Sequence, residues 1–131
     1  GFPLEPFLNA GSKSGIREKL GLRPDDFVVG KIARLFELKG HDDLFAVAPG
    51  IVASCPRTVF LLVGDGPWRE RFENTVRRLG LDEHFIFAGL VPPADVPDYV
   101  GVMDVLVHLS TREGLPRALP QALAAGKPVV A

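Results

Sequence analysis

Residues 27–40 read FVVGKIARLFELKG. The part up to Ala33 is short, mostly apolar and rich in β-branched residues, as is typical of a buried strand. Similar runs recur downstream, and we expect further strands at 58–63, 84–88, 104–109 and from 129 onward. Because these runs are apolar along most of their length, the strands should be covered on both faces.

Longer amphipathic stretches separate the strands. From Trp68 to Leu79, apolar residues recur at helical spacing with charged residues on the opposite face. Gly80 follows directly, as a helix-ending glycine should. Weaker patterns predict two short helices, at 16–20 and at 97–103.

Residues 42–53 form another helical pattern, but the Pro49-Gly50 pair in its middle should kink or split the helix.

Taken together, the predicted strands and helices alternate along the chain. This alternation predicts an α/β fold, a Rossmann-like doubly wound parallel sheet with right-handed crossovers. Ligands bind such sheets beyond the carboxyl ends of the strands. The loops in which to look for chemistry are therefore 34–40, 64–67, 89–93 and 110–120.

The two ends of the chain differ in character. Residues 1–14 show neither a strand nor a helix period, and we interpret them as an interdomain linker. Residues 15–131 carry the alternating pattern and end inside a predicted strand. We therefore expect 15–131 to be a partial domain whose sheet edge is covered by a partner or a neighbouring segment.

The composition, 47% hydrophobic and 24% charged residues, is that of a soluble globular domain. Fifteen Lys and Arg against sixteen Asp and Glu leave a net charge of -1, which argues against a nucleic-acid partner. The longest apolar runs are much shorter than the roughly 20 residues of a membrane span. The single Cys55 cannot form an internal disulfide. We expect a cytoplasmic location, with peripheral contact of a parent protein at the inner membrane face left open.

Two of the loops after strands carry residues suited to phosphate. Arg34 and Lys39 stand five residues apart, and Gly40 opens the next predicted helix. A guanidinium, an ammonium and free helix N–H groups together fit a diphosphate, although two solvated surface cations are the alternative. Gly64 and Gly66 would let the backbone approach a ligand closely, but an ordinary turn explains them equally well.

A second candidate anion site follows the fourth predicted strand. The backbone N–H groups of Gly114 and Leu115 precede a predicted helix and should be free to bind an anion. Glu113 beside them suits ligand hydroxyls or a cation, and a solvated side chain is its alternative interpretation.

No other chemistry is indicated by the residue pattern. The three histidines have no metal-ligand spacing, and we interpret His84 and His108 as structural and His41 as a candidate lining residue. No nucleophile with a neighbouring histidine and acid is evident, and no P-loop sequence occurs. The simplest site is therefore metal-free and uses arginine, lysine and helix dipoles.

Five segments, taken in order, resemble the nucleotide-sugar-binding C-terminal domain of retaining glycosyltransferases of the GT-B fold, of the glycosyltransferase family 4 type. These segments are 27–40, 61–67, 87–91, 113–116 and 124–131. Each segment is weakly specific, but their joint order and spacing are specific. The resemblance implies one half of a GT-B architecture.

The resemblance also implies roles for single residues. Arg34 and Lys39 match cations that hold the donor diphosphate and stabilise charge as it leaves. Glu113 matches the first acid of a Glu-x7-Glu pair, which contacts the donor sugar. In the family the second acid holds the ribose. The matching residue here is Gln121, whose side chain keeps an oxygen acceptor but has no negative charge. The other implied substrate-binding positions are Gly64, Gly66, Val91, Gly114, Leu115 and Pro116.

The implied reaction moves a sugar, with retention, from a nucleotide diphosphate sugar of the UDP type to an unknown acceptor. No metal is required, because cations already face the departing diphosphate. The family's N-terminal acceptor-binding domain has no counterpart in these residues. The chain is therefore expected to bind donor without turning it over.

Other functions stay open on the same residues. A non-catalytic nucleotide- or phosphate-binding module would share the scaffold, and Gln121 favours it. An epimerase acting on nucleotide sugars also shares the GT-B fold. A receiver-type signalling domain would need acids at the end of the first strand, where Arg34 stands instead.

Overall fold

The computed structural model describes residues 14–36, 39–107 and 129–130, which form a parallel sheet between helices. In chain order the elements are α2 (Ser14–Lys19), β1 (Phe27–Ile32), α3 (His41–Ser54), β2 (Thr58–Val63), α4 (Arg69–Arg78), η2 (Asp82–His84), β3 (Phe85–Gly89), η3 (Pro93–Asp95), α5 (Val96–Gly101), β4 (Val105–Val107) and β5 (Val129–Val130). The predicted α/β class with a parallel sheet is confirmed.

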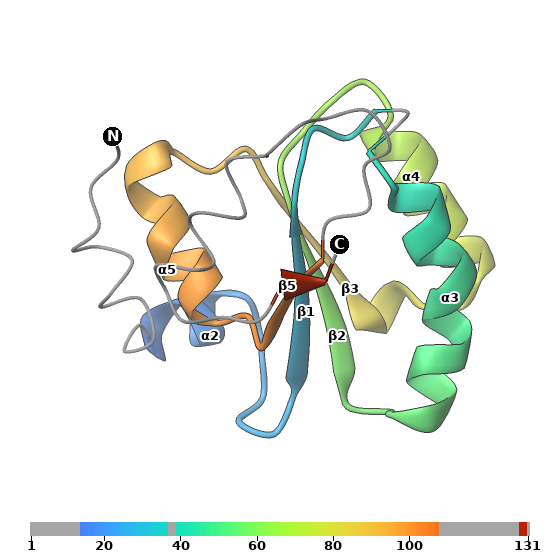
Figure 1. The fold of residues 1–131 in the computed structure, drawn as a ribbon, viewed down its shortest axis with the longest axis horizontal. Helices are drawn as coiled ribbons and strands as arrows, with labels where there is room; N and C mark the ends of the chain where they lie inside the picture. Colours follow the sequence, from blue (N-terminus) through green and yellow to red (C-terminus); the bar gives the residue numbers. More distant parts are fainter. Residues whose placement is uncertain (1–13, 37–38, 108–128, 131) are drawn as a thin grey trace.

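The strand order is β3-β2-β1-β4-β5, and every neighbouring pair is parallel. From β1 the chain moves outward to β2 and β3, and β4 then returns to the other side of β1. The strand order therefore reverses between β1 and β4. The carboxyl ends of β1, β2 and β3 meet at the upper edge in Figure 1, where doubly wound sheets bind their ligands.

Helices cover both faces of the sheet. Figure 1 shows α3 and α4 on one side and α2 and α5 on the other. Under α3 and α4 the core contains Leu35, Leu44, Phe45, Ala48, Phe60, Leu62, Phe72, Val76, Leu81 and Phe85. Under α2 and α5 it contains Leu22, Val28, Val59, Leu61, Val63, Val91, Val96, Tyr99, Val100, Val102, Met103 and Leu106. All six residues of β2 are buried, because β2 lies between two strands and two helical layers.

The predicted boundaries agree closely with the observed ones. The strand at 58–63 is confirmed without change, and the first strand is one residue shorter than expected. The third begins one residue later, because His84 closes η2. β4 begins after Asp104, whose carboxylate accepts a hydrogen bond from the Val28 N–H (2.7 Å) while its own N–H donates to the Val28 carbonyl (2.8 Å). Asp104 thus joins β4 to the start of β1.

Pro49 was expected to kink or split the helix at 42–53, and it does not split it. Residues His41–Ser54 form one continuous helix with Pro49 inside it. Pro49 is exposed, whereas Leu44, Phe45 and Ala48 on the opposite face are buried against the sheet. Proline removes one backbone hydrogen bond from a helix. Burial of this apolar face offsets that loss, so tertiary packing outweighs the local penalty.

His41 opens α3 and is a core residue with 2% of its surface exposed. Its ring stacks on Phe72 of α4, with 4.8 Å between ring centroids. Among the described residues, neither ring nitrogen has a hydrogen-bond partner. Burial, and secondarily the positive charge of Lys31, lowers the pKa of His41 to about 3. The expectation that His41 lines a site is therefore wrong, because its stacking on Phe72 turns it into the core.

We expect the free energy of unfolding to decrease as the pH falls from about 6.5 toward 3. Over this range the unfolded chain binds a proton at His41 that the folded chain does not bind, so protonation favours unfolding. Urea unfolding at a series of pH values would measure the effect. In His41→Phe, which preserves ring stacking, the decrease should be smaller. The carboxylates are common to both proteins. If the free energy of unfolding had the same pH dependence in both, the conclusion that His41 is buried in its neutral form would be contradicted.

Candidate functional site

A hollow of about 420 Å³ opens at the carboxyl ends of β1, β2 and β3. It is lined by Ile32, Ala33, Arg34, Val63, Gly64, Asp65, Leu90, Val91 and Val96. Three residues singled out from the sequence, Arg34, Gly64 and Val91, are thus brought together although they lie far apart in the chain. Its walls are mainly aliphatic, with Arg34 and Asp65 as the charged lining residues. This combination suits a ligand with a flat apolar part and an anionic part.

The loop after β1 places Arg34 at the rim of this hollow. Arg34 is exposed, and its guanidinium lies 5.5 Å from the ring centroid of Phe36. Phe36 in turn meets Trp68 edge to face, at 5.2 Å between centroids. The Trp68 N–H donates to the Leu35 carbonyl (3.0 Å), which ties this loop to the start of α4. Ring contacts therefore restrict Arg34 without using its guanidinium hydrogen bonds.

Gly64 and Gly66 are required by the packing of one loop on another. At Gly64, where φ is 133°, an added Cβ would collide with the carbonyl oxygen of Ala33. At Gly66 it would collide with the Leu35 carbonyl oxygen. The loop after β2 therefore lies directly against the loop after β1. Gly64 lines the hollow, whereas Gly66 is not among its lining residues.

The same two loops are joined by polar contacts that the residue pattern did not single out. The Asp65 carbonyl accepts from the Leu35 N–H (3.1 Å), and the Asp65 carboxylate lies 3.4 Å from Arg69. Arg69 also reaches Glu73 (3.3 Å) and the carbonyl of Phe87 in β3 (3.4 Å). Asp65 lies in the loop 64–67, which follows a predicted strand. Its position at the carboxyl end of the sheet could therefore have been inferred from the sequence.

Lys39 ends the same loop as Arg34 and precedes Gly40, the N-cap of α3. Gly40 has φ of 81°, a left-handed conformation that glycine adopts without strain. Lys39 is half-buried and is not among the residues that line the hollow. Arg34 and Lys39 are thus at opposite ends of one loop, with the hollow beside Arg34.

Lys31 in β1 is a buried lysine that no sequence motif indicated. Only 1% of its surface is exposed, and among the described residues its ammonium has no hydrogen-bond partner. Burial and the positive charge of Lys39 lower its pKa to about 8, against a smaller opposing effect of Asp43. Its place inside an apolar strand gave no signal of function, since only the tertiary structure shows how completely it is buried.

Several predicted site residues lie outside the described part of the chain. These are Glu113, Gly114, Leu115, Pro116 and Gln121, together with His108. The linker assigned to 1–14 likewise falls outside it, except that Ser14 begins α2. The roles assigned to these residues therefore remain predictions.

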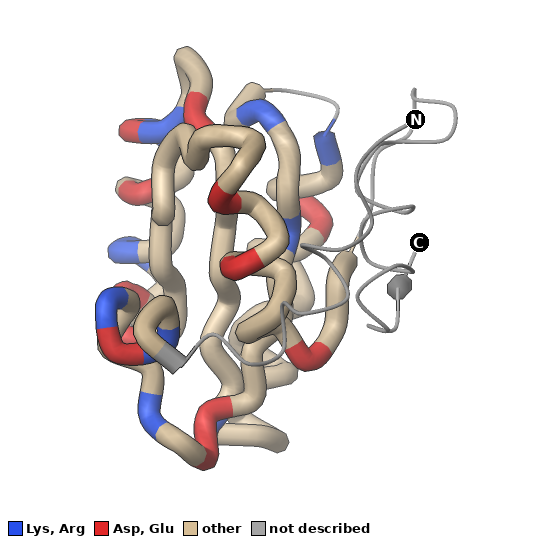
Figure 2. Tube along the Cα trace, turned by 90° about the vertical axis from the view of Figure 1, so that its left-hand side faces the viewer, with Lys and Arg blue, Asp and Glu red and all other residues tan. Residues whose placement is uncertain are grey.

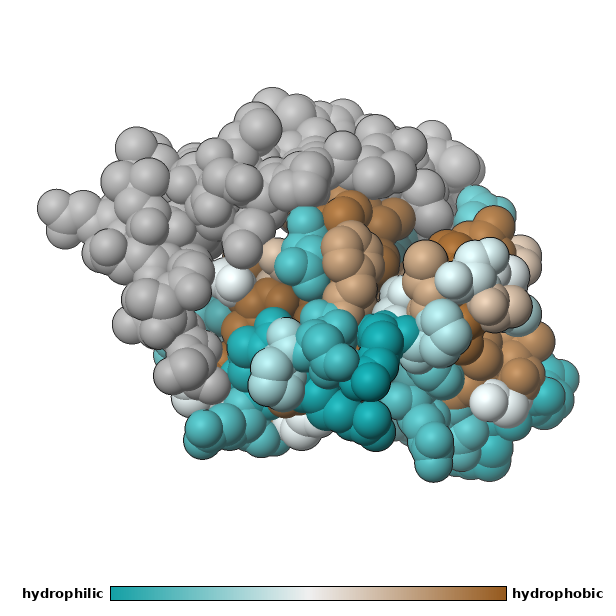
Figure 3. All heavy atoms as spheres, turned by 90° about the horizontal axis from the view of Figure 1, so that it is seen from below, coloured by the Kyte–Doolittle hydropathy of each residue, from teal (hydrophilic) through white to brown (hydrophobic). Residues whose placement is uncertain are grey.

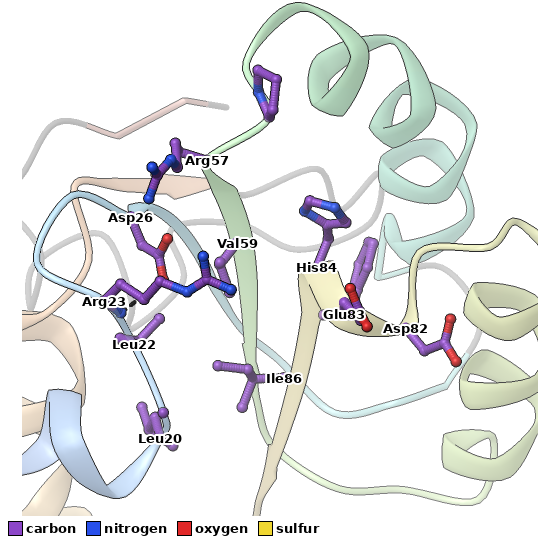
Figure 4. A pocket seen from close by; sticks show the side chains of 13 residues that line it. Leu20, Leu22, Arg23, Asp26, Arg57, Val59, Asp82, Glu83, His84 and Ile86 are labelled. Carbon is purple, nitrogen blue, oxygen red and sulfur yellow. Dashed lines mark hydrogen bonds between the residues drawn. The ribbon is translucent and has the colours of Figure 1, made fainter.

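A second hollow, of about 260 Å³, lies at the opposite edge of the sheet, where the strands begin. That edge, seen from below in Figure 3, carries many hydrophilic residues. Figure 4 shows Arg23, Asp26 and Arg57 near one another, with Glu83 and His84 across the hollow. His84 Nδ1 lies 2.9 Å from the carbonyl of Thr58, which supports its structural interpretation. Mixed charges line this hollow, and it lies away from the strand ends that bind ligands in such folds.

Charged residues of both signs occur over the described part of the chain. Figure 2 shows acidic and basic residues interspersed along the described trace. In the described ranges, no helix is long and apolar enough to cross a bilayer. Within the same ranges, no three His, Cys, Asp or Glu side chains are grouped as metal ligands.

Comparison with known proteins points to one family. The family described as "Glycosyl transferases group 1" matches residues 12–131. The chain is 38% identical over 112 residues to 2-deoxystreptamine N-acetyl-D-glucosaminyltransferase of Streptomyces fradiae. That alignment covers 84% of this chain and 27% of the relative. An alignment with alpha-monoglucosyldiacylglycerol synthase of Acholeplasma laidlawii, at 29% identity, covers 99% of this chain and 34% of that protein.

Solved structures agree in fold. A crystal structure of Anabaena Alr3699/HepE with UDP and glucose superposes with a TM-score of 0.85 at 32% identity, covering 100% of this chain and 36% of that one. The C-terminal domain of a glycosyl transferase group 1 family protein, LpcC, from Francisella tularensis has a TM-score of 0.81 at 20% identity. The match covers 98% of this chain and 69% of that one. At this identity it shows a likeness of fold alone.

The chain thus spans about a third of the length of the curated relatives above. Its Rossmann-like sheet matches the C-terminal domain of GT-B glycosyltransferases, as the resemblance implied. With the family match covering residues 12–131, the chain belongs to the glycosyl transferases group 1 family.

Proposed function

We propose that this chain is the donor-binding part of a retaining glycosyltransferase of the family 4 type, which uses a nucleotide diphosphate sugar. The observation that carries the proposal is the hollow at the carboxyl ends of β1–β3, with Arg34 at its rim. Structures of Anabaena Alr3699/HepE, at 32% identity over the whole chain, contain UDP or UDP with glucose. A UDP-type donor is therefore the first candidate ligand.

Different residues suit the base and the phosphates of such a donor. Val91, Val96 and Leu90 offer aliphatic surface on which a flat base can lie. Arg34 offers a planar guanidinium for phosphate oxygens, and Lys39 a mobile point charge from the other end of the same loop. Gly64 lets the loop after β2 pack against the carbonyl of Ala33, and both residues line the hollow.

The remaining roles come from the family pattern. Glu113 would contact the donor sugar, Gln121 the ribose, and the backbone of 114–116 the phosphates. As the bond from sugar to phosphate breaks, negative charge grows on the diphosphate. Arg34 and Lys39 then stabilise the transition state more than the bound donor, and no metal ion is needed for this step.

We expect UDP to bind saturably and the double variant Arg34→Ala, Lys39→Ala to lose most of this affinity. Charge-assisted hydrogen bonds contribute about 1.5–3 kcal/mol each, so the loss should exceed tenfold. Calorimetry with UDP, GDP and ADP would measure it and identify the base. The matched control is Arg77→Ala, Arg78→Ala at the exposed end of α4, which should bind as the unchanged chain does. Absence of binding by a folded chain would contradict the proposal.

Gln121 provides a second test. If it holds the ribose, Gln121→Glu should strengthen UDP binding by roughly 1 kcal/mol, since a charged acceptor replaces a neutral one. Gln121→Ala should weaken binding. An unchanged dissociation constant in both variants would remove Gln121 from the site.

The alternative is a non-catalytic nucleotide-binding module on the same fold, which the neutral Gln121 favours. Both proposals predict nucleotide binding by this chain, and they differ in whether a longer protein that also supplies the acceptor site transfers the sugar. Since the chain spans about a third of its curated relatives, we propose that these residues bind donor and leave the acceptor to residues outside this sequence. Sustained sugar transfer by this chain to an added acceptor would contradict that division.

A further inference from the structure

Aromatic rings in contact lead from the core under α3 and α4 to the rim of the hollow. Phe72, with 1% of its surface exposed, packs on the rings of His41 and Phe45, at 4.8 and 5.3 Å between centroids. Trp68, one helical turn before Phe72, meets it edge to face at 6.0 Å. The next ring along is Phe36, whose centroid lies 5.2 Å from that of Trp68. Phe36 is thus connected to the core through Trp68.

Backbone hydrogen bonds fix the loop next to Phe36. The Trp68 N–H donates to the carbonyl of Leu35 at 3.0 Å, and the Leu35 N–H donates to the carbonyl of Asp65 at 3.1 Å. Leu35 is fully buried. Both backbone groups of the residue between Arg34 and Phe36 are therefore bonded, one to the start of α4 and one to the loop after β2.

Arg34 lies at the exposed end of this series of rings. The Phe36 N–H donates to the Arg34 carbonyl at 3.0 Å, and this tight turn brings the two side chains together. The guanidinium carbon lies 5.5 Å from the centroid of the Phe36 ring. A cation within about 6 Å of a ring centroid is attracted to the face of the ring. A core-anchored ring thus contacts the cation that lines the hollow.

A guanidinium can contact a ring and bind phosphate at the same time. Stacking uses its face, whereas its N–H donors point outward in its plane. Ordering a long side chain on binding costs affinity, so an arginine that is already restricted binds an anion more tightly. Leucine at position 36 would also bury apolar surface on Trp68, but it would not attract the cation. The aromatic character of Phe36 therefore bears on Arg34 specifically.

We propose that Phe36 is a positioning residue of the donor site, whose ring, supported by Trp68, holds the Arg34 guanidinium at the rim of the hollow for the phosphates of a nucleoside diphosphate. This inference rests on the function proposed above. Phe36 is not among the residues that line the hollow, and it acts through Arg34.

A double-mutant cycle on UDP affinity, measured by calorimetry, tests this role. Phe36→Leu should weaken UDP binding about two- to fivefold, the factor that corresponds to the attraction between an exposed cation and a ring. Phe36→Tyr, which keeps the ring, should restore the affinity of the unchanged chain. In an Arg34→Ala background, where no guanidinium is left to hold, Phe36→Leu should leave the dissociation constant unchanged.

Phe27→Leu is the matched control. Phe27 is 46% exposed at the start of β1, at the edge of the sheet opposite the hollow. The same change of residue type there should leave UDP affinity as it is. Urea unfolding of each variant shows that it is folded under the conditions of the titration.

The outcomes separate the two proposals. If UDP binds saturably and Phe36→Leu leaves its affinity unchanged or raises it, the role of Phe36 is overturned and the donor site stands. Equal weakening by Phe36→Leu with and without Arg34 makes the ring a packing residue and also overturns its role. No saturable binding by the folded, unchanged chain overturns both proposals. If Phe36→Leu does not fold, the same cycle with Trp68→Leu decides, because the ring of Trp68 supports that of Phe36.

Discussion

The architecture depends on one constraint: β1 has a strand on each side and a helical layer on each face. Its hydrogen bonds run to β2 along the full strand and to β4 through Val29 and Gly30. A strand in this position must be apolar and must allow close packing, which Gly30 does by admitting Met103 against the backbone. Because β1 is central, the loop that leaves it at Ala33 is delivered to the point where strand order reverses.

The site follows from that placement. The loop after β2 can reach the loop after β1 only because Gly64 and Gly66 have no side chain. Arg34 is then held at the rim by its contact with Phe36, and Phe36 by Trp68. A long arginine that remains solvent-accessible but is restricted by aromatic rings loses less conformational entropy when it binds an anion. The fold therefore restricts Arg34 at the strand ends, where the proposed donor site would need a cation.

Two buried polar side chains show how the core acts on ionisable groups. His41 and Lys31 both lie in the layer under α3, and burial suppresses the charged form of each. His41 remains neutral and serves as an aromatic core residue on Phe72. Burial lowers the pKa of Lys31 to about 8, so this side chain remains mostly protonated at neutral pH. Burial acts alike on the two, but their different ordinary pKa values leave the histidine neutral and the lysine mostly charged at neutral pH.

From the residues alone, the strands, the main helices, the parallel sheet and the ligand-binding edge follow, because apolar periodicity and strand-helix alternation are local properties of the chain. Arg34 and Gly64 could be selected for the same reason, since each follows a predicted strand, whereas Val91 was selected through the family resemblance. The continuity of α3 through Pro49 could not be predicted, because it depends on burial of Leu44, Phe45 and Ala48 against the sheet.

Tertiary contacts likewise account for what the residue pattern left open elsewhere. In the sequence, Gly64 and Gly66 fit a ligand loop and an ordinary turn equally well, and the structure gives both a packing reason in the Ala33 and Leu35 carbonyls that lie against them. His41 and Lys31 gave no sequence signal of their burial. Whether a polar side chain is exposed, paired or isolated depends on which segments pack over it, and those segments lie far away in the chain.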